Sequence, residues 1–215
     1  MIEVQNRGLL AYQQAWDLQK NVVAQRIVGT IADQLILCEH PHVYTFGKSA
    51  DRSNLLISPD FLEAIGAQSF EIERGGDITY HGPGQLVGYP ILNLHLRQMG
   101  VKKYVDLLED SIIQTVAQFG IEATRIDGLT GIWIDDVIPR KIAAIGIKIS
   151  RGVTMHGFAL NVGTDLSYYN HIVPCGITDK GVTSMAKETG GILGVDEVIP
   201  TYIQCFSAVF EGISA

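Results

Sequence analysis

The stretch "PRKIAAIGIKISRGVTMHGFALNV", residues 139–162, contains two long apolar runs on either side of Arg151-Gly152. Apolar runs of this length, bounded by turn residues, are typical of neighbouring strands. The strands predicted in this region cover 121–126, 132–136, 141–150 and 153–162. Several consecutive strands between helices predict an α+β fold, in which a mixed, largely antiparallel sheet is flanked by helices that cover mainly one face.

Helices are predicted before and after these strands. Residues 101–119 form the clearest amphipathic pattern, which Gly120 ends. Ser58 and Pro59 are typical of an N-cap and a first helical turn, and they begin a short helix that ends at Gly66. The remaining predicted elements are helices over 8–28 and 197–213 and strands over 33–40 and 68–73. No repeat, low-complexity tract or linker interrupts this order, so residues 1–215 are expected to form a single domain.

The composition argues against several functional classes. A net charge of -7 and a pI near 5.3 disfavour nucleic-acid binding, which needs a basic face. Cys38, Cys175 and Cys205 lie far apart without a CxxC motif, so neither a disulfide framework nor a zinc ribbon is predicted. His40 and His42 lack further ligands nearby, and no metal site is predicted. Because the chain lacks a long apolar run and a signal-peptide pattern, a cytoplasmic protein is expected.

A second stretch, "RGGDITYHGPGQLVGYPILNL" at residues 74–94, is dense in glycine. Such a loop either makes tight turns or lets a ligand approach the backbone closely. Arg74, Asp77 and His81 favour the second alternative, because polar side chains around bare backbone suit a pocket for an elongated ligand. The stretch is not G-x-G-x-x-G, and "FGKS" at 46–49 lacks the first glycine of a P-loop, so ATP binding is not predicted.

Cys175 lies between a proline and a glycine in "HIVPCGITDKGVTSM", residues 171–185. These neighbours predict a turn that would hold the sulfur at a loop tip, where a substrate can reach it. The alternative is an inert loop cysteine. A thiol with a reference pKa of about 8.5 needs a nearby cation to react efficiently at neutral pH.

The candidate cations lie in the first stretch and are Arg140, Lys141, Lys148, Arg151 and His156. In a strand that begins near Lys141, side chains alternate between faces, so this lysine shares an otherwise apolar row. A lysine in such a row either extends its amine to solvent at the strand edge or pairs with a functional group. An ammonium beside a thiolate would lower the pKa of the thiol. The predicted row consists of Lys141, Ala143, Ile145 and Ile147.

Three segments together, "RGGDITYHGPGQLVGYPI", "KIAAIGIKISRGVTMHGFALNV" and "IVPCGITDKGVTS", resemble the octanoyltransferases of lipoate biosynthesis. The resemblance covers most of the chain and implies one catalytic domain with a fold like that of biotin and lipoate protein ligases. It implies transfer of an octanoyl or lipoyl group from acyl carrier protein to a lysine of lipoyl domains. The implied acceptors are 2-oxoacid dehydrogenase complexes and the glycine cleavage H protein. No cofactor, nucleic acid or membrane partner is implied.

By motif, the resemblance implies that Cys175 is the nucleophile that forms an acyl thioester and that Lys141 tunes its reactivity. The chemistry leaves open whether Lys141 or His81 takes the proton of the attacking amine. Backbone N–H groups near 144–146 and 157–159 are candidates for stabilising the developing oxyanion. The implied substrate pocket consists of Arg74, Gly75, Gly76, Asp77, Ile78, Thr79, Tyr80, His81, Ala144, Ile145, Gly146, Gly157, Phe158 and Ala159.

Two alternatives to an acyltransferase remain open. One is a lipoate or biotin protein ligase, which shares the fold but activates a free acid with ATP. The other is a non-catalytic protein that sequesters an acyl chain, although binding alone does not need an exposed thiol. For an acyltransferase, docking of the acidic carrier protein calls for local positive charge near the active site. The basic residues expected there are Arg97, Lys102, Lys103, Arg140, Lys148 and Arg151.

Overall fold

The computed structural model describes residues 1–173 and 180–211, in which an eight-stranded mixed sheet forms the main layer. Its strands are β1 (Ile2–Leu9), β2 (Asp33–Glu39), β6 (Gln85–Ile91), β7 (Thr124–Ile126), β8 (Leu129–Ile134), β9 (Arg140–Ser150), β10 (Val153–Asn161) and β11 (Gly181–Val182). Their order is β1-β2-β6-β10-β9-β8-β7, with β11 paired to β9. β1 with β2 and β11 with β9 are parallel, and the other pairs are antiparallel. The predicted α+β fold with a mixed, largely antiparallel sheet is confirmed.

Three further strands form a separate small sheet. They are β3 (Val43–Phe46), β4 (Gln68–Glu71) and β5 (Ile78–His81), in the order β4-β3-β5. Helix α2 (Pro59–Ala64) connects the parallel pair β3 and β4, and the Ser58 side chain accepts a hydrogen bond from the Phe61 N–H, as its predicted N-cap role requires. Because β5 and β6 lie within residues 74–94, the interpretation of this stretch as a loop holds only for its turns.

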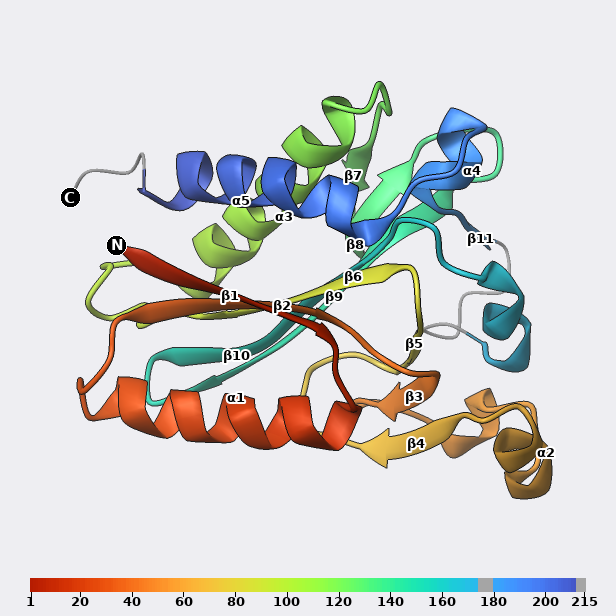
Figure 1. Ribbon diagram of the computed structural model, residues 1–215, viewed down its shortest axis with the longest axis horizontal. Coiled ribbons are helices and arrows are strands. Elements are labelled where there is room, and N and C mark those ends of the chain that lie inside the picture. Colours follow the sequence, from red (N-terminus) through yellow and green to blue (C-terminus); the bar gives the residue numbers. More distant parts are fainter. Residues whose placement is uncertain (174–179, 212–215) are drawn as a thin grey trace.

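Helices cover both faces of the main sheet, so the prediction of a sheet covered mainly on one face is wrong (Figure 1). Helix α1 (Tyr12–Ile27) packs on one face, and α3 (Val101–Ala117) and α5 (Val195–Glu211) pack on the other. The reason lies in strands that are apolar on both sides. In β2, Leu35 and Leu37 join the core under α3 and α5, whereas Ile36 and Cys38 join the core under α1. The remaining helices are η1 (Arg52–Asn54), η2 (Leu166–His171) and α4 (Met185–Thr189).

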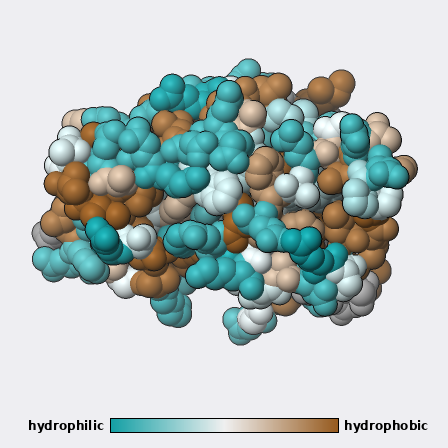
Figure 2. Space-filling view, turned by 90° about the horizontal axis from the view of Figure 1, so that it is seen from below, coloured by the Kyte–Doolittle hydropathy of each residue, from teal (hydrophilic) through white to brown (hydrophobic). Residues whose placement is uncertain are grey.

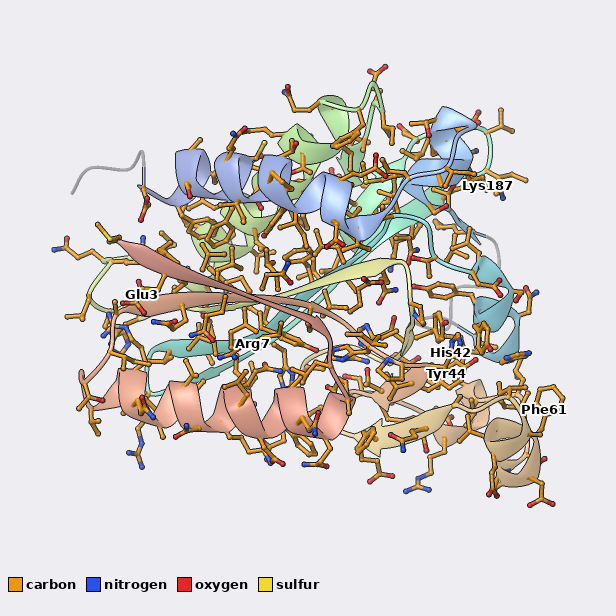
Figure 3. All side chains as sticks on the ribbon, viewed as in Figure 1. Glu3, Arg7, His42, Tyr44, Phe61 and Lys187 are labelled. Carbon is orange, nitrogen blue, oxygen red and sulfur yellow. The ribbon has the colours of Figure 1, made fainter. Side chains whose placement is uncertain are left out.

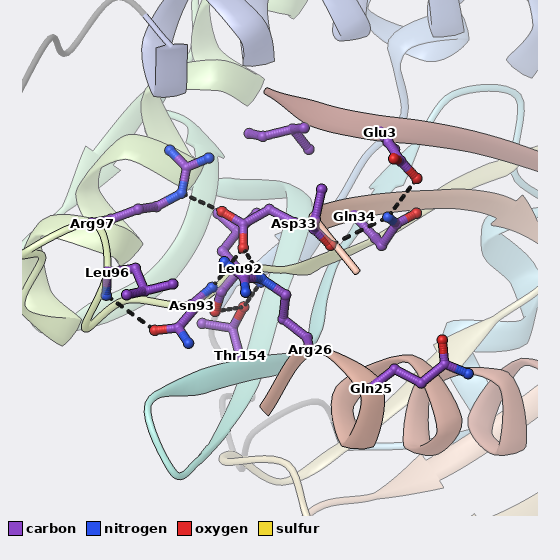
Figure 4. A network of polar contacts seen from close by, with 12 residues as sticks. Glu3, Gln25, Arg26, Asp33, Gln34, Leu92, Asn93, Leu96, Arg97 and Thr154 are labelled. Carbon is purple, nitrogen blue, oxygen red and sulfur yellow. Dashed lines mark hydrogen bonds and ion pairs between the residues drawn. The ribbon is translucent and has the colours of Figure 1, made fainter. Parts of the chain in front are cut away.

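A buried carboxylate connects several of these elements (Figure 4). Asp33, at the start of β2, accepts hydrogen bonds from Arg26 Nε of α1 at 2.6 Å and from Arg97 Nε at 2.6 Å. Its Oδ1 also accepts the backbone N–H of Asn93 at 2.9 Å. Arg97 in turn donates to the carbonyl of Phe210 at 3.1 Å. Asp33 therefore joins α1, the main sheet and the segment after β6, and Arg97 extends this network to the end of α5.

The outward face of α1 is polar, as expected for a helix that buries only one side. Figure 2 views the molecule from this side, and hydrophilic side chains extend across the middle of the face. The exposed polar residues of α1 include Gln13, Gln14, Asp17, Lys20 and Asn21. Within residues 1–173 and 180–211, no helix has the length and hydrophobicity that crossing a bilayer requires.

Candidate functional site

A cavity of about 740 Å³ lies where residues 74–81 approach β9 and β10. Most of the predicted pocket residues line it, although they come from three separate parts of the sequence. The predicted residues that line the cavity are Arg74, Gly75, Gly76, Asp77, Thr79, His81, Ala144, Ile145, Gly146, Gly157, Phe158 and Ala159. Ile78 and Tyr80 do not line it, because these alternate positions of β5 are buried in a core cluster with Tyr44 and Tyr169.

Arg74 holds the glycine-rich turn in place. Its guanidinium donates to the carbonyl of Thr45 at 2.6 Å, to the hydroxyl of the same residue at 3.0 Å, and to the carbonyl of Gly75 at 3.0 Å. The N–H of Gly75 donates to the carbonyl of Ile147 in β9 at 3.0 Å. A Cβ on Gly146 would lie 2.8 Å from Arg74 Cδ, so glycine is needed there for the turn to cross β9.

His81 is buried beside the cavity with a fixed neutral tautomer. Its Nδ1 lies 2.8 Å from Gln85 Oε1, which can only accept, so Nδ1 carries the proton. The amide nitrogen of Gln85 is oriented by the carbonyl of Tyr80, Asn161 Oδ1 and the hydroxyl of Tyr169. Burial, reinforced by His40, lowers the pKa of His81 to about 3. Such a histidine is a weak proton acceptor, which favours Lys141 between the two open alternatives.

Lys141 lines the same cavity, with its amine 4.7 Å from the centre of the Trp133 ring. A bulge in β9 determines its placement, because Trp133 pairs with Lys141 whereas the preceding Ile132 pairs with Ala143. The consecutive residues Ile142 and Ala143 consequently both join the core under α3 and α5. The unbroken alternation predicted for residues 141–147 is therefore wrong, and the bulge separates Lys141 from the apolar row.

Cys175, the predicted nucleophile, lies outside the described residues, as do all of 174–179. The chain before this segment is fixed near the cavity. The N–H of Val173 donates to the carbonyl of Asn54 at 2.8 Å. The Asn54 side chain donates to Asp77 Oδ2 at 2.6 Å, and Asp77 lines the cavity.

The chain after this segment is fixed beside Lys141. Val182 of β11 pairs with Lys141 and lines the cavity, and the N–H of Thr183 donates to the carbonyl of Lys141 at 3.0 Å. The neighbouring Arg140 holds Glu188 of α4 through two hydrogen bonds of 3.2 and 3.1 Å. Both described ends of the chain around Cys175 therefore contact elements that line the cavity.

An aromatic cluster fixes η2, which leads toward Val173. The His42 ring stacks on Tyr168 with the ring centres 4.1 Å apart, and the hydroxyl of Tyr44 donates to the carbonyl of Tyr168 at 2.9 Å. Figure 3 shows His42 and Tyr44 together on the side of the small sheet that faces η2. Tyr80 stacks against the same Tyr168 ring at 5.1 Å.

Neither of the other cysteines lines the cavity. Cys38 is buried in β2, where burial raises the pKa of its thiol well above the ordinary value. Cys205 lies on α5 and lines a shallow depression between α3 and α5. Among the described residues, no thiol is therefore placed to attack a ligand in the cavity.

His156 was a candidate cation, and the structure corrects this. Burial, with Arg74 and Lys148 adding to it, lowers the pKa of His156 to about 3, so the ring is neutral at physiological pH. Its position in the cavity wall was not predicted, and the His-Gly pair within β10 was the available signal. Other lining residues that sequence reasoning missed include Tyr12, Tyr89, Trp133, Asn161 and Tyr169.

Several of the basic residues expected to dock an acidic partner form ion pairs within the chain. Such pairs reduce the positive charge that a partner would meet. Arg97 pairs with Asp33, Lys102 with Asp106, Arg140 with Glu188 and Asp136, and Lys148 with Glu73. A continuous basic surface made of all six predicted residues is therefore not supported.

Comparison with known proteins agrees with this fold. The profile of the lipoyl protein ligase A/B catalytic domain matches residues 11–207. The chain is 49% identical to an octanoyltransferase of Cytophaga hutchinsonii, over 97% of this chain and 92% of that protein. A bi-partite lipoate protein ligase of Thermoplasma acidophilum superposes with a TM-score of 0.73 at 17% identity, over 98% of this chain and 85% of that one. A biotin protein ligase of Aquifex aeolicus superposes with a TM-score of 0.54 at 12% identity, over 98% of this chain and 69% of that one. The predicted ligase-like fold is confirmed.

Proposed function

The chain belongs to the octanoyltransferases of the lipoyl protein ligase A/B family, an acyltransferase group that acts in protein lipoylation, and we propose that its octanoyl donor is acyl carrier protein. The proposed acceptor is a lysine of the lipoyl domains of 2-oxoacid dehydrogenase complexes and of the glycine cleavage H protein. In this proposal residues 1–215 form a single catalytic domain, and the reaction passes through a thioester on Cys175.

One observation carries the proposal. Lys141 lines the cavity, and its backbone pairs with β11, the strand that follows the Cys175 segment. An ammonium near a thiol stabilises the thiolate, which is the reactive form of cysteine. The apolar walls suit the acyl chain, since each buried CH₂ contributes about 0.8 kcal/mol and an octanoyl tail roughly 5 kcal/mol before ordering costs.

In the first step, the Cys175 thiol gives its proton to Lys141 and its sulfur attacks the thioester carbonyl of the carrier. The carbon–sulfur bond to the carrier breaks, and the departing thiolate takes the proton from Lys141. In the second step, the neutral amine of the acceptor lysine attacks the Cys175 thioester. An amide forms, the bond to Cys175 breaks, and Lys141 takes the proton of the amine, which regenerates the thiolate and ammonium pair.

The backbone of β9 offers a donor for the oxyanion of both steps. The carbonyl of Ile147 accepts a hydrogen bond from the N–H of Gly75, and it lies on the edge of β9 that faces away from β10. In an antiparallel strand the backbone groups of alternate residues point to the same edge, so the N–H of Ile145 lies on the same edge as the carbonyl of Ile147. Ala143 is the last β9 residue that pairs with β8, so β8 does not extend to Ile145. Ala144 and Gly146 instead direct their N–H groups toward β10. Ile145 is therefore the donor that we propose.

An assay of transfer from octanoyl carrier protein to a purified lipoyl domain tests this function. With enzyme far below the acceptor concentration and no ATP, we expect many acceptor molecules to be modified per enzyme molecule. A requirement for ATP and free octanoic acid would instead support a ligase. Modification of no more than one acceptor per enzyme would contradict catalysis.

A further inference from the structure

We propose that the end of the cavity at His156 is a polar subsite that binds a neutral hydroxyl at the far end of an acyl chain. This inference rests on the proposed function, because it concerns the acyl group that the same cavity would hold. It specifies the substrate class: acyl chains of about eight to ten carbons that carry a hydrogen-bonding group at the distal end.

The first observation is an unsatisfied ring nitrogen. His156 lines the cavity and is only 2% exposed. Its Nε2 has no hydrogen-bond partner within residues 1–173 and 180–211, although its backbone N–H donates to Gln19 Oε1 at 2.9 Å. A buried polar atom left without a partner costs free energy, and a ligand group that supplies the partner recovers it.

The second observation is the backbone of the same residue. Among the described non-glycine residues, Gln98, Arg151 and His156 have positive φ. The first two lie in turns, whereas His156 has a φ of 60° inside β10, where it pairs with Ile147. A strained conformation in the middle of a strand persists only where the surroundings enforce it, and such residues cluster at ligand sites.

The third observation is the chemistry around the imidazole. Burial and the nearby cations Arg74 and Lys148 keep His156 neutral, so one ring nitrogen donates and the other accepts, which suits a hydroxyl. Tyr89 lines the same cavity, and its hydroxyl lies 2.7 Å from His40 Nε2. His40 Nδ1 lies 2.6 Å from the carbonyl of Leu10 and must carry the proton, so the hydroxyl donates to Nε2 and keeps an oxygen lone pair.

The position of His156 matches the far end of an acyl chain. Lys141 and Ile147, the partner of His156, are six positions apart in β9, which is roughly 20 Å of strand. An extended eight-carbon chain covers roughly 10 Å of this distance. Lys141 and His156 both line the same cavity, so an acyl chain that extends along β9 from Lys141 carries its distal group toward the imidazole.

The test compares plain and ω-hydroxylated octanoyl and decanoyl carrier protein as donors. For wild type, we expect the ω-hydroxyl to be accepted with little loss of kcat/KM. In His156→Gly, which suits the positive φ but lacks the imidazole, the ratio of hydroxylated to plain donor should fall about three- to tenfold. His156→Asn keeps a hydrogen-bonding group and tolerates positive φ, so it should recover part of the ratio. His95→Gly, at an exposed histidine, is the matched control and should leave the ratio unchanged.

A second measurement needs neither a variant nor turnover. In ¹⁵N-histidine-labelled wild type, free 8-hydroxyoctanoate or 10-hydroxydecanoate should shift the Nε2 resonance of His156 more than the corresponding plain acids do. An equal ratio in wild type and His156→Gly, or a resonance that responds equally to both kinds of acid, would overturn the proposal. Failure of the proposed function is distinguishable, because it would appear as absent transfer of plain octanoyl by wild type.

Discussion

Replacement of Lys141 by methionine should lower octanoyl transfer by a factor of about 10² to 10⁴. Methionine keeps an unbranched chain over the Trp133 ring but removes the amine, which is 4.7 Å from that ring in the structure. Without the amine, the Cys175 thiolate loses its stabilising cation and both chemical steps lose their proton acceptor. The pH at which alkylation of Cys175 becomes fast should therefore be higher than in wild type, and peptide mass spectrometry measures this alkylation.

The matched control is Lys187→Met on α4, because Lys187 is exposed. This variant should transfer octanoyl at the wild-type rate and show the wild-type pH dependence of alkylation. The midpoint of thermal unfolding of Lys141→Met should stay close to that of wild type, since methionine keeps an unbranched apolar side chain at this position. If Lys141→Met transferred octanoyl at the wild-type rate, the proposed role of this lysine would be wrong.

Replacement of Asp33 by alanine should lower the free energy of unfolding by about 3 to 5 kcal/mol. Asp33 is buried and holds Arg26 and Arg97, both at 2.6 Å, so its loss leaves two guanidinium groups without their carboxylate. For a chain of this size the midpoint of thermal unfolding should fall by about 10 °C. Urea unfolding followed by circular dichroism measures the change in free energy.

Asp17→Ala provides the comparison for this prediction. Asp17 also forms an ion pair, with Lys20 at 2.7 Å, but both side chains are exposed on α1. Exposed pairs contribute little, so the urea midpoint of this variant should match that of wild type. Equal losses in the two variants would mean that burial of Asp33 does not govern its contribution.

Elements with strong periodicity were predictable from the sequence. The amphipathic pattern of 101–119 corresponds to α3 (Val101–Ala117), and the two apolar runs of 139–162 correspond to β9 and β10. In these elements the local pattern and the tertiary packing require the same residues, because one continuous face is buried. The residues of 74–81, 144–146 and 157–159 were likewise identified by resemblance, and the structure places most of them around one cavity.

Elements that depend on distant partners were not predictable in this way. Within residues 1–173 and 180–211, β1 is a mostly exposed edge strand that pairs with β2 alone, so its apolar alternation does not continue beyond Val4. β6 contains Gly88 and Pro90, which disfavour strands, but the absence of a Cβ at Gly88 leaves room for the Phe158 ring of the neighbouring strand β10. The bulge in β9 is also set by pairing with β8, and local sequence does not reveal it.

The central claim is that the octanoyl group passes through a thioester on Cys175, and intact-protein mass spectrometry tests it most directly. After incubation with octanoyl carrier protein without ATP or acceptor, wild type should gain one octanoyl mass that hydroxylamine removes. Peptide mapping should place it on Cys175, and Cys175→Ala should gain none and transfer none. Transfer by Cys175→Ala at the wild-type rate, or a hydroxylamine-resistant adduct on another residue, would contradict the account.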